Sequence, residues 1–245
     1  MDEPAVDLAF SRHLGGEVLR SERRRVLNLA SMLTSILAVI LVLLAVAPGV
    51  IHAVFRGPIP WHLPLAVFLP FILYELAVAG GVTMLARRGR GFPRVARYAN
   101  ALIETSFPTL LIYVLSRYID APVVFNSWPS LLYFLFIILS TLRLDFFISA
   151  FTGAVAAVEL FVLADYRLHL TWGVANLDRT IIFHLSRSVV LVAAGLLAGL
   201  VGVTIRGYFA RALAAASARD RVTNLSASKS RPRWSIGCSP SARPN

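Results

Sequence analysis

The chain has 245 residues, of which 57% are hydrophobic and only 15% are charged. Soluble domains usually carry about 25% charged residues, so this composition argues against an ordinary soluble globular protein. The formal net charge is +11, and a basic chain of this kind can bind nucleic acid. Here the arginines stand at the ends of long apolar blocks, so we interpret the charge as a membrane-topology signal and predict no nucleic-acid partner.

The first apolar block covers residues 26–47 and contains no charged residue. Roughly 18 or more apolar residues suffice to cross the hydrocarbon core of a bilayer. The block is too long for the core of a signal peptide, and no small-residue cleavage site followed by a soluble domain appears after it. We therefore interpret it as a retained span in contact with the lipid bilayer.

Five further blocks follow in chain order. They lie near residues 63–86, 98–115, 129–142, 146–163 and 181–205, and the fourth is the shortest. Each is continuously apolar, whereas barrel strands would alternate over about 10 residues. A helix also satisfies its backbone N–H and C=O groups within lipid. The predicted fold is all-α, a polytopic bundle of six transmembrane helices in a membrane domain at 26–205.

The distribution of arginine predicts the orientation of these spans. Arginine clusters at 20–25, 87–97 and 206–221 fall on one side of the predicted bundle, and the other side holds only single arginines. Cytoplasmic loops of membrane proteins carry an excess of arginine and lysine. We therefore expect both termini in the cytoplasm, with residues 1–25 as a basic cytoplasmic N-terminus.

The sequence offers little that would support catalysis. It has a single cysteine, Cys238, and its five histidines lack paired metal-binding spacing, so we predict no metal site. It has no glycine-rich phosphate loop and no Gly-x-Ser-x-Gly motif. The glycines inside spans favour close helix packing over a ligand loop; they are Gly80, Gly81, Gly195, Gly199 and Gly202. We therefore predict no cofactor and no catalytic residue.

Ionisable groups inside the spans are the strongest candidates for function. Each costs about 2.5–3.5 kcal/mol on insertion scales and requires a partner or a water-filled cavity. They are Glu75, Glu104, Glu159, His184 and Arg187. Glu159 and Arg187 are expected at similar depth on antiparallel neighbouring spans, so we predict that they contact each other. Such a pair would either fix helix register or line an outward-facing ligand pocket or switch.

The segment 98–109 is the most unusual part of the spans. It places Asn100, Glu104, Thr105 and Pro108 in one predicted helix. Asn100 and Glu104 are four residues apart and therefore share a helix face. Pro108 cannot donate a hydrogen bond to the Glu104 carbonyl and can kink the helix. This pattern predicts either a polar binding site or an ordinary polar contact between helices.

Several runs of the sequence carry a resemblance to a known family. They read Ala-Leu-Ile-Glu-Thr-Ser-Phe-Pro-Thr at 101–109, Ser-Leu-Leu-Tyr-Phe-Leu-Phe-Ile-Ile-Leu-Ser-Thr-Leu-Arg-Leu at 130–144, and Phe-Thr-Gly-Ala-Val-Ala-Ala-Val-Glu at 151–159. These runs resemble the six-helix membrane sensor region of bacterial class III adenylate/guanylate cyclases. The segment Ala-Ala-Ser-Ala-Arg-Asp-Arg-Val-Thr-Asn-Leu at 215–225 resembles the helical transducer that joins this region to the cyclase domain, so we predict a juxtamembrane transducer helix at 206–225.

The resemblance implies a role in cyclic-nucleotide signal transduction at the bacterial cytoplasmic (inner) membrane. It implies an unidentified small-molecule or lipid ligand, and a homodimer formed through the spans and the transducer helix. Phe209, Leu213 and Ala216 recur at steps of four and three residues, which gives that helix a short apolar seam for pairing. In the family, a Phe-Gly-Gln-x-Val-Ser-Pro linker and the catalytic domain follow, and the intact protein converts ATP to cyclic AMP.

The sequence departs from that pattern after Leu225. Residues 226–245 are rich in serine, arginine and proline and lack periodicity, which is typical of a disordered basic tail. A frameshift is the sharper hypothesis. One T restored before codon 226, with suitable third codon bases, makes the chain read Phe-Gly-Gln-Gln-Val-Ser-Pro. We therefore predict a truncated sensor and transducer that lacks the catalytic domain and is not itself an enzyme.

Two other classes of protein stay open. A small transporter or channel subunit of the inner membrane would place Glu75, Glu104 and Arg187 along a transport path. A structural assembly protein would need no ligand. The charged helix at 206–225 favours the sensor, because a transporter has no need to carry it.

Overall fold

The computed structural model describes residues 3–49, 53, 59–88, 93–172 and 177–229. These residues form helices and connecting turns and contain no strand, which confirms the predicted all-α class. The chain divides into two units, Met1–Val203 and Thr204–Asn245. The packing described below lies within the first unit.

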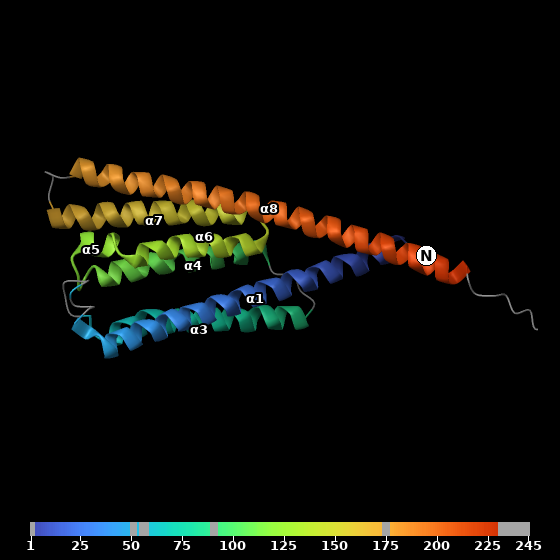
Figure 1. Cartoon of the computed structure of the whole chain (residues 1–245), viewed down its shortest axis with the longest axis horizontal. Helices are drawn as coiled ribbons and strands as arrows, with labels where there is room; N and C mark the ends of the chain where they lie inside the picture. Colours follow the sequence, from blue (N-terminus) through green and yellow to red (C-terminus); the bar gives the residue numbers. More distant parts are fainter. Residues whose placement is uncertain (1–2, 50–52, 54–58, 89–92, 173–176, 230–245) are drawn as a thin grey trace, which may run out of the picture. The chain divides into compact units, whose positions relative to one another are not determined.

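Figure 1 shows the described helices in their order along the chain. Their bounds are α1 Glu3–Val46, α3 His62–Arg87, α4 Arg94–Leu115, α5 Ala121–Phe125, η1 Trp128–Leu131, α6 Leu132–Ser140, η2 Thr141–Arg143, α7 Phe146–Trp172 and α8 Leu177–Lys229, where η marks a 3₁₀ helix.

Within the described residues, five segments are long and apolar enough to cross a membrane. They are Ser21–Val46, His62–Arg87, Ala121–Arg143, Phe146–Arg167 and Ile182–Ala212. These segments match every predicted block except 98–115, which forms α4. That helix is less apolar because it carries groups such as Asn100 and Glu104, and both side chains are buried. The described helices are those of a multi-pass membrane protein.

The fourth predicted block, 129–142, is not one uniform helix. The short α6 is flanked by the 3₁₀ helices η1, which contains Pro129, and η2. The chain leaves η2 through Leu144, whose φ of 52° lies in the left-handed region. A leucine rarely adopts this conformation. It ends the helix and lets α7 start only two residues later, at Phe146.

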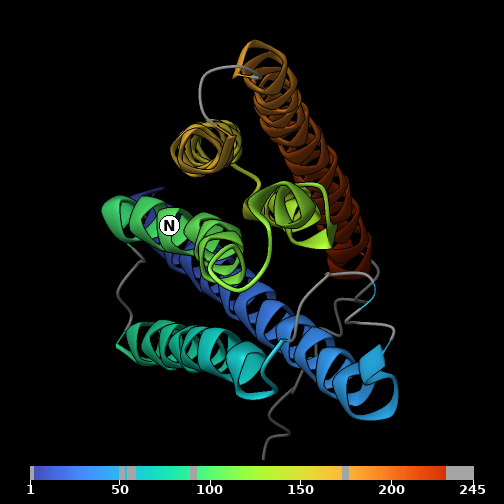
Figure 2. The ribbon, with the colours of Figure 1, turned by 90° about the vertical axis from the view of Figure 1, so that its left-hand side faces the viewer.

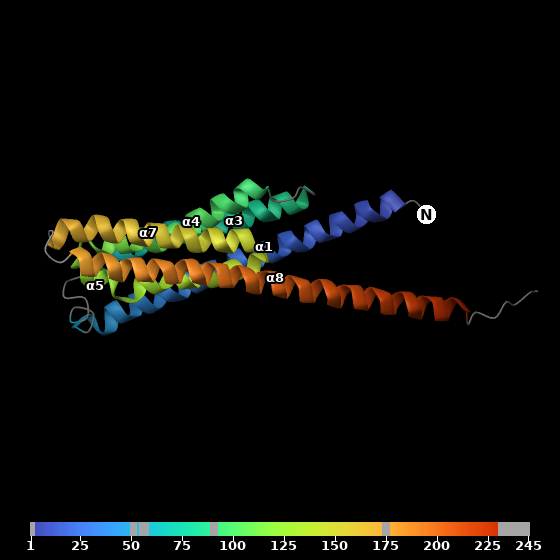
Figure 3. The ribbon, with the colours of Figure 1, turned by 90° about the horizontal axis from the view of Figure 1, so that it is seen from above.

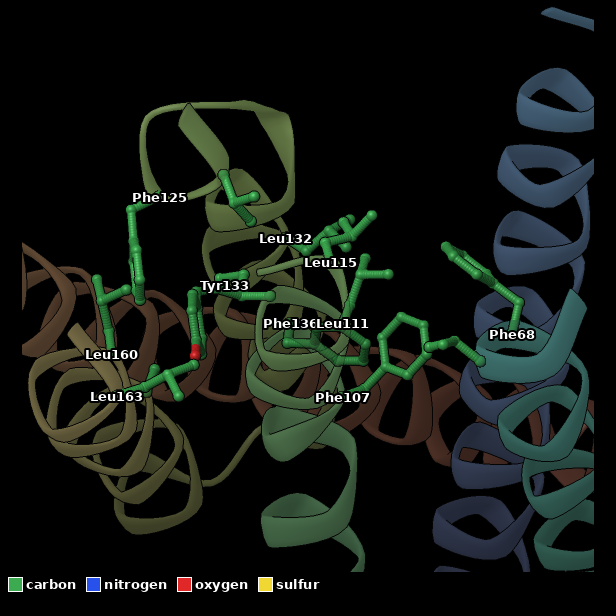
Figure 4. Packing of buried hydrophobic residues seen from close by; sticks show 14 of the residues in the cluster. Phe68, Phe107, Leu111, Leu115, Phe125, Leu132, Tyr133, Phe136, Leu160 and Leu163 are labelled. Atoms are coloured by element: carbon green, nitrogen blue, oxygen red, sulfur yellow. The ribbon is translucent and has the colours of Figure 1, made fainter. Parts of the chain in front are cut away.

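Aromatic side chains hold the centre of the bundle together. α3 lies along α1, and α4 packs against α6 and α7 (Figure 2). The ring of Phe107 on α4 stacks on Phe71 at 4.4 Å between centroids and meets Phe68 edge-on at 5.1 Å. Phe107 lies between Phe68 of α3 and Phe136 of α6 (Figure 4). Such ring pairs stabilise a core beyond their buried area.

Glycines bring α7 and α8 into close contact. The two helices run side by side in Figures 1 and 3. A methyl group on Gly195 would lie 2.7 Å from the Cα atom of Gly153, and one on Gly199 would lie 2.7 Å from the ring of Phe146. Small residues of this kind allow helix backbones to approach in membranes. The predicted packing role is confirmed for Gly195 and Gly199 and is wrong for Gly80 and Gly81, where an added methyl group would meet nothing within 4 Å.

The helix α8 extends past Leu225 to Lys229, so it enters the segment 226–245 that the sequence predicts to be a disordered tail. The rest of that segment, including Cys238, lies outside the described residues. In the predicted seam, Phe209 is exposed, while the side chains of Leu213 and Ala216 lie outside those described.

Candidate functional site

The centre of the candidate site is a buried ion cluster between α1, α4 and η2. The Nη1 and Nη2 atoms of Arg25 donate to the two carboxylate oxygens of Glu104, both at 2.8 Å. Arg143 Nη2 donates to Glu104 Oε2 at 3.0 Å. The exposed fractions are 2% for Arg25, 5% for Glu104 and 9% for Arg143. A two-pronged arginine–carboxylate pair of this kind is both strong and geometrically specific.

Polar neighbours add further hydrogen bonds to this cluster, although Arg143 Nε is buried without a partner among the described residues. Glu22 accepts from Arg25 Nε at 3.1 Å. Asn100 donates to Glu104 Oε1 at 2.5 Å and accepts from the Tyr74 hydroxyl at 2.8 Å. Arg143 Nη1 also donates to the Arg97 carbonyl oxygen at 2.9 Å. With two arginines and the carboxylates of Glu22 and Glu104, the ion cluster is neutral, which is the condition for keeping charge in a buried site.

The sequence pattern predicted two members of this cluster, Asn100 and Glu104. The predicted shared face of Asn100 and Glu104 is confirmed by their hydrogen bond. Thr105 is buried too, but its hydroxyl donates to the Ala101 carbonyl oxygen of its own helix, so it is not a member of the cluster. The helix α4 continues through Pro108 to Leu115.

The sequence pattern did not predict either arginine partner, Arg25 or Arg143. Arg25 belongs to the basic cluster at 20–25, which was interpreted as a signal of orientation, and Arg143 is a single arginine at the end of a span. Arg25 directly precedes the apolar block 26–47, and Arg143 directly follows the block 129–142. These positions at span ends, together with a buried carboxylate that needs a cation, are the signal that could have found them.

Glu75 lies beside the cluster but outside its hydrogen-bond network. Its side chain is fully buried, and neither carboxylate oxygen has a hydrogen-bond partner in the described part of the chain. It interacts electrostatically with Glu104, Arg25 and Arg143. A buried carboxylate without hydrogen bonds is costly, so Glu75 is a candidate for a functional rather than a packing role.

Glu159 belongs to a separate polar site between α4 and α7. Its Oε1 accepts from the Ser106 hydroxyl at 2.5 Å, and its Oε2 accepts from the Thr109 hydroxyl. Thr109 and Tyr133 hydroxyls are 2.7 Å apart, which links this site to α6. The carboxylate is thus bound by neutral hydroxyl groups.

The predicted pairing of Glu159 with Arg187 is wrong. Arg187 Nη1 donates to the Phe125 carbonyl oxygen at 2.8 Å, and Nη2 donates to the Ser130 hydroxyl at 2.6 Å. Similar depth on neighbouring helices is not sufficient for two side chains to meet, because each side chain contacts only the helices that its own helix face packs against. Glu159 faces α4, whereas Arg187 faces α5 and η1.

His184 is buried one turn before Ser188 on α8, and its ring meets Phe125 edge-on at 5.4 Å. Ser188 donates to the Ala157 carbonyl oxygen at 3.1 Å and so joins α8 to α7. His184 therefore lies in an aromatic contact, away from the carboxylates of the ion cluster. Among the described residues, no group of three or more histidine, cysteine, aspartate or glutamate side chains could hold a metal ion.

The ion cluster is connected to α8 through the backbone around η2. Thr141 and Leu144 flank Arg143, and a methyl group on Gly202 of α8 would lie 3.2 Å from the Thr141 carbonyl oxygen. Gly202 itself is buried. The backbone around η2 and the α8 backbone at Gly202 are therefore closely packed.

No protein-family model, curated protein or solved structure matches this chain.

Proposed function

We propose that this chain is the membrane-embedded sensor and transducer region of a bacterial class III adenylate/guanylate cyclase. The observation that carries the proposal is the buried Arg25–Glu104–Arg143 cluster, which joins α1 and α4 to η2. The backbone around η2 lies against Gly202 of α8. The helix α8 continues without interruption to Lys229. A ligand that favoured one arrangement of the cluster would have a direct mechanical route into this helix.

The nature of the cluster supports a switch. Buried ion pairs contribute little net stability, and their best-attested use is to select one packing arrangement over another. Three elements meet at Glu104, so an alternative arrangement would move α1, α4 and η2 together. Signalling needs two states of this kind, each favoured by different contacts.

The proposal includes the resemblance to the cyclases and the frameshift after Leu225. The chain would work as a homodimer in the bacterial inner membrane and would make no cyclic nucleotide by itself. The direct test restores one nucleotide before codon 226 in the native gene and assays membranes for conversion of ATP to cyclic AMP. A stop codon within a few residues, or a restored frame without a cyclase domain, would overturn the truncated-cyclase hypothesis.

A second test needs no native catalytic domain. Residues 1–225 are fused to a soluble class III catalytic domain that is active only as a dimer, and cyclic AMP is measured in membranes. We expect Glu104→Gln to change this output, while Gly80→Ala, at an exposed glycine with open space around it, leaves it unchanged. Equal output from both variants at equal expression would argue against a switch at Glu104.

We also propose that six spans place both termini in the cytoplasm, with α4 as the remaining span. Its Asn100 and Glu104 side chains are turned inward to the ion cluster, so the mean hydropathy of α4 understates how well the helix fits within the bundle. Reporter fusions after Arg25, Arg90 and Arg221 should read as cytoplasmic, and one near Trp172 as external. A cytoplasmic reading at Trp172 would contradict six spans.

Glu75 favours a second candidate function, a small transporter or channel subunit. A fully buried carboxylate without a hydrogen bond is a group that could take up a proton or a cation along a path. Proteoliposomes that contain the purified protein would show Glu75-dependent flux of protons or cations in this case. Absence of flux, with an output from the fusion that depends on Glu104, would favour the sensor.

A further inference from the structure

A cavity lies between α6, α7 and α8, away from the ion cluster. Its volume is about 130 Å³, well above the roughly 10–15 Å³ that one water needs. It is lined by Ser130, Phe134, Leu160, Ser186, Arg187, Val190 and Leu191. All seven residues belong to the unit Met1–Val203.

One side of the cavity is closed and the other is open. Leu160, Leu191 and Ser130 are buried and form its floor, while Ser186 and Val190 are exposed. Exposed apolar residues continue along α8 from this rim, at Leu197 and Val201. In a membrane-spanning helix such a face lies against lipid, so the opening is accessible to molecules within the bilayer.

Arg187 supplies the only charge in the lining of this cavity. Its two observed hydrogen bonds go to neutral oxygens, those of Phe125 and Ser130. None of the salt bridges between described residues includes it. The ring of Phe183, 5.6 Å from the guanidinium carbon, adds a cation–π contact but no negative charge.

The hydrogen-bond partners of the half-buried Arg187 differ from those of the buried arginines. Arg25 and Arg143 both reach the Glu104 carboxylate. A cation inside a span is expected to pair with an anion or to reach water. Two of the five guanidinium donors are used by Phe125 and Ser130. The remaining donors are available to a group that enters from the lipid.

We propose that this cavity binds an anionic amphiphile, whose carboxylate or phosphate head pairs with Arg187 and whose hydrocarbon chain enters the apolar floor and follows the exposed face of α8. An arginine fork matches either head group. Leu160 and Leu191 give the first methylene groups an apolar contact. A soluble anion would lack this second contribution, and a neutral lipid would lack the first.

This inference names the ligand class of the proposed sensor and rests on that function for its biological meaning. Binding itself is measured independently of any cyclase output. If the anionic amphiphile binds but no fusion responds to it, the sensor proposal fails and the binding site stands. If a fusion responds through Glu104 but no amphiphile binds at Arg187, the sensor proposal stands and the proposed binding site is wrong.

The experiment uses the full chain in phosphatidylcholine nanodiscs, with retained molecules counted by native mass spectrometry. Three probes are added separately, phosphatidylglycerol, oleate and inorganic phosphate. We expect retention of phosphatidylglycerol or oleate, and the better of the two identifies the head group. Retention of phosphate alone, or retention of neither amphiphile above the phosphatidylcholine background, would overturn the proposal.

Two variants with matched controls locate the site. Arg187→Gln should weaken binding roughly tenfold or more, the factor that one charge-assisted hydrogen bond supplies. The control Arg117→Gln removes an exposed arginine outside the cavity and should have no effect. Ser186→Phe should block the opening with Arg187 intact, because Ser186 is exposed and bonds only to Phe183 of its own helix. Val189→Phe, at an exposed neighbour outside the lining, is its control.

Ser186→Phe decides the outcome if Arg187→Gln does not fold. Undiminished retention in Ser186→Phe would show that the amphiphile binds elsewhere on the apolar surface. Equal losses in Ser186→Phe and Val189→Phe would show a general effect of bulk on α8. Loss in Ser186→Phe alone supports the cavity.

Discussion

Glu104 and Glu159 are both glutamates inside the helical bundle, on the neighbouring helices α4 and α7, but their partners differ in kind. Glu104 is bound by the guanidinium groups of Arg25 and Arg143. Glu159 is bound by the hydroxyl groups of Ser106 and Thr109 and is only half-buried. In the first region each charge depends on the others, whereas in the second one carboxylate depends on neutral donors.

The depth of a carboxylate within a span therefore does not decide how much the protein depends on it, because the chemical nature of its partners decides this. An ion cluster becomes unstable when one member is removed, because the remaining charge stays buried without compensation. A carboxylate held by hydroxyl groups loses only hydrogen bonds that a neutral amide can partly replace. The variants below break or sharpen this difference, from the largest expected effect to the smallest.

Glu104→Gln should destabilise the protein most, by about 3–5 kcal/mol, because it leaves Arg143 buried without its carboxylate partner and leaves Arg25 with Glu22 alone. Unfolding of the purified protein in mixed micelles, followed by circular dichroism, measures the loss. The double variant Arg25→Gln/Glu104→Gln should lose less than the sum of the single variants. Additive losses would show that Arg25 and Glu104 do not interact.

Gly195→Ala should cost about 1–3 kcal/mol, because the new methyl group would lie 2.7 Å from the Gly153 Cα atom and force α7 and α8 apart. The same unfolding assay applies. Gly80→Ala on α3 is the matched control, since its methyl group would meet nothing within 4 Å. That control should be neutral or stabilising by about 0.5–1 kcal/mol, as alanine favours the helix. Equal effects at both positions would contradict the close contact.

Glu159→Gln should cost about 1 kcal/mol or less, because the amide oxygen can still accept from Ser106 or Thr109. Tyr133→Phe, which removes the hydroxyl next to Thr109, should have a similar effect. Arg187→Gln combined with Glu159→Gln should be additive, because these residues have separate partners. Strong coupling between the two substitutions in this double-mutant cycle would show that Glu159 and Arg187 interact directly, in contradiction to the structure.

Glu75→Gln should change stability least, by less than about 1 kcal/mol in either direction, because the amide that replaces the costly carboxylate is also buried at a position without hydrogen-bond partners. Thermal unfolding of this variant and of Glu104→Gln in the same micelles provides the comparison. A loss as large as that of Glu104→Gln would mean that Glu75 is an essential member of the ion cluster.

The sequence by itself determined the all-α class, the positions of most spans and the pairing of Asn100 with Glu104. Each depends on a property that is local along the chain. Long apolar blocks must be helical in lipid because their backbone groups need partners within the segment. Residues four apart share a helix face whatever surrounds the helix.

Only the tertiary structure decided which charges meet. Arg25 and Arg143 are far from Glu104 in sequence, and their contact requires α1, α4 and η2 to converge. The sequence suggested Arg187 for Glu159 because the two depths agreed. The rotation of each helix about its own axis instead turns Glu159 toward Ser106 and Arg187 toward Ser130. That rotation is set by the packing of whole helix faces, such as the approach of Gly195 to Gly153, and so it cannot be derived from the depth of individual residues.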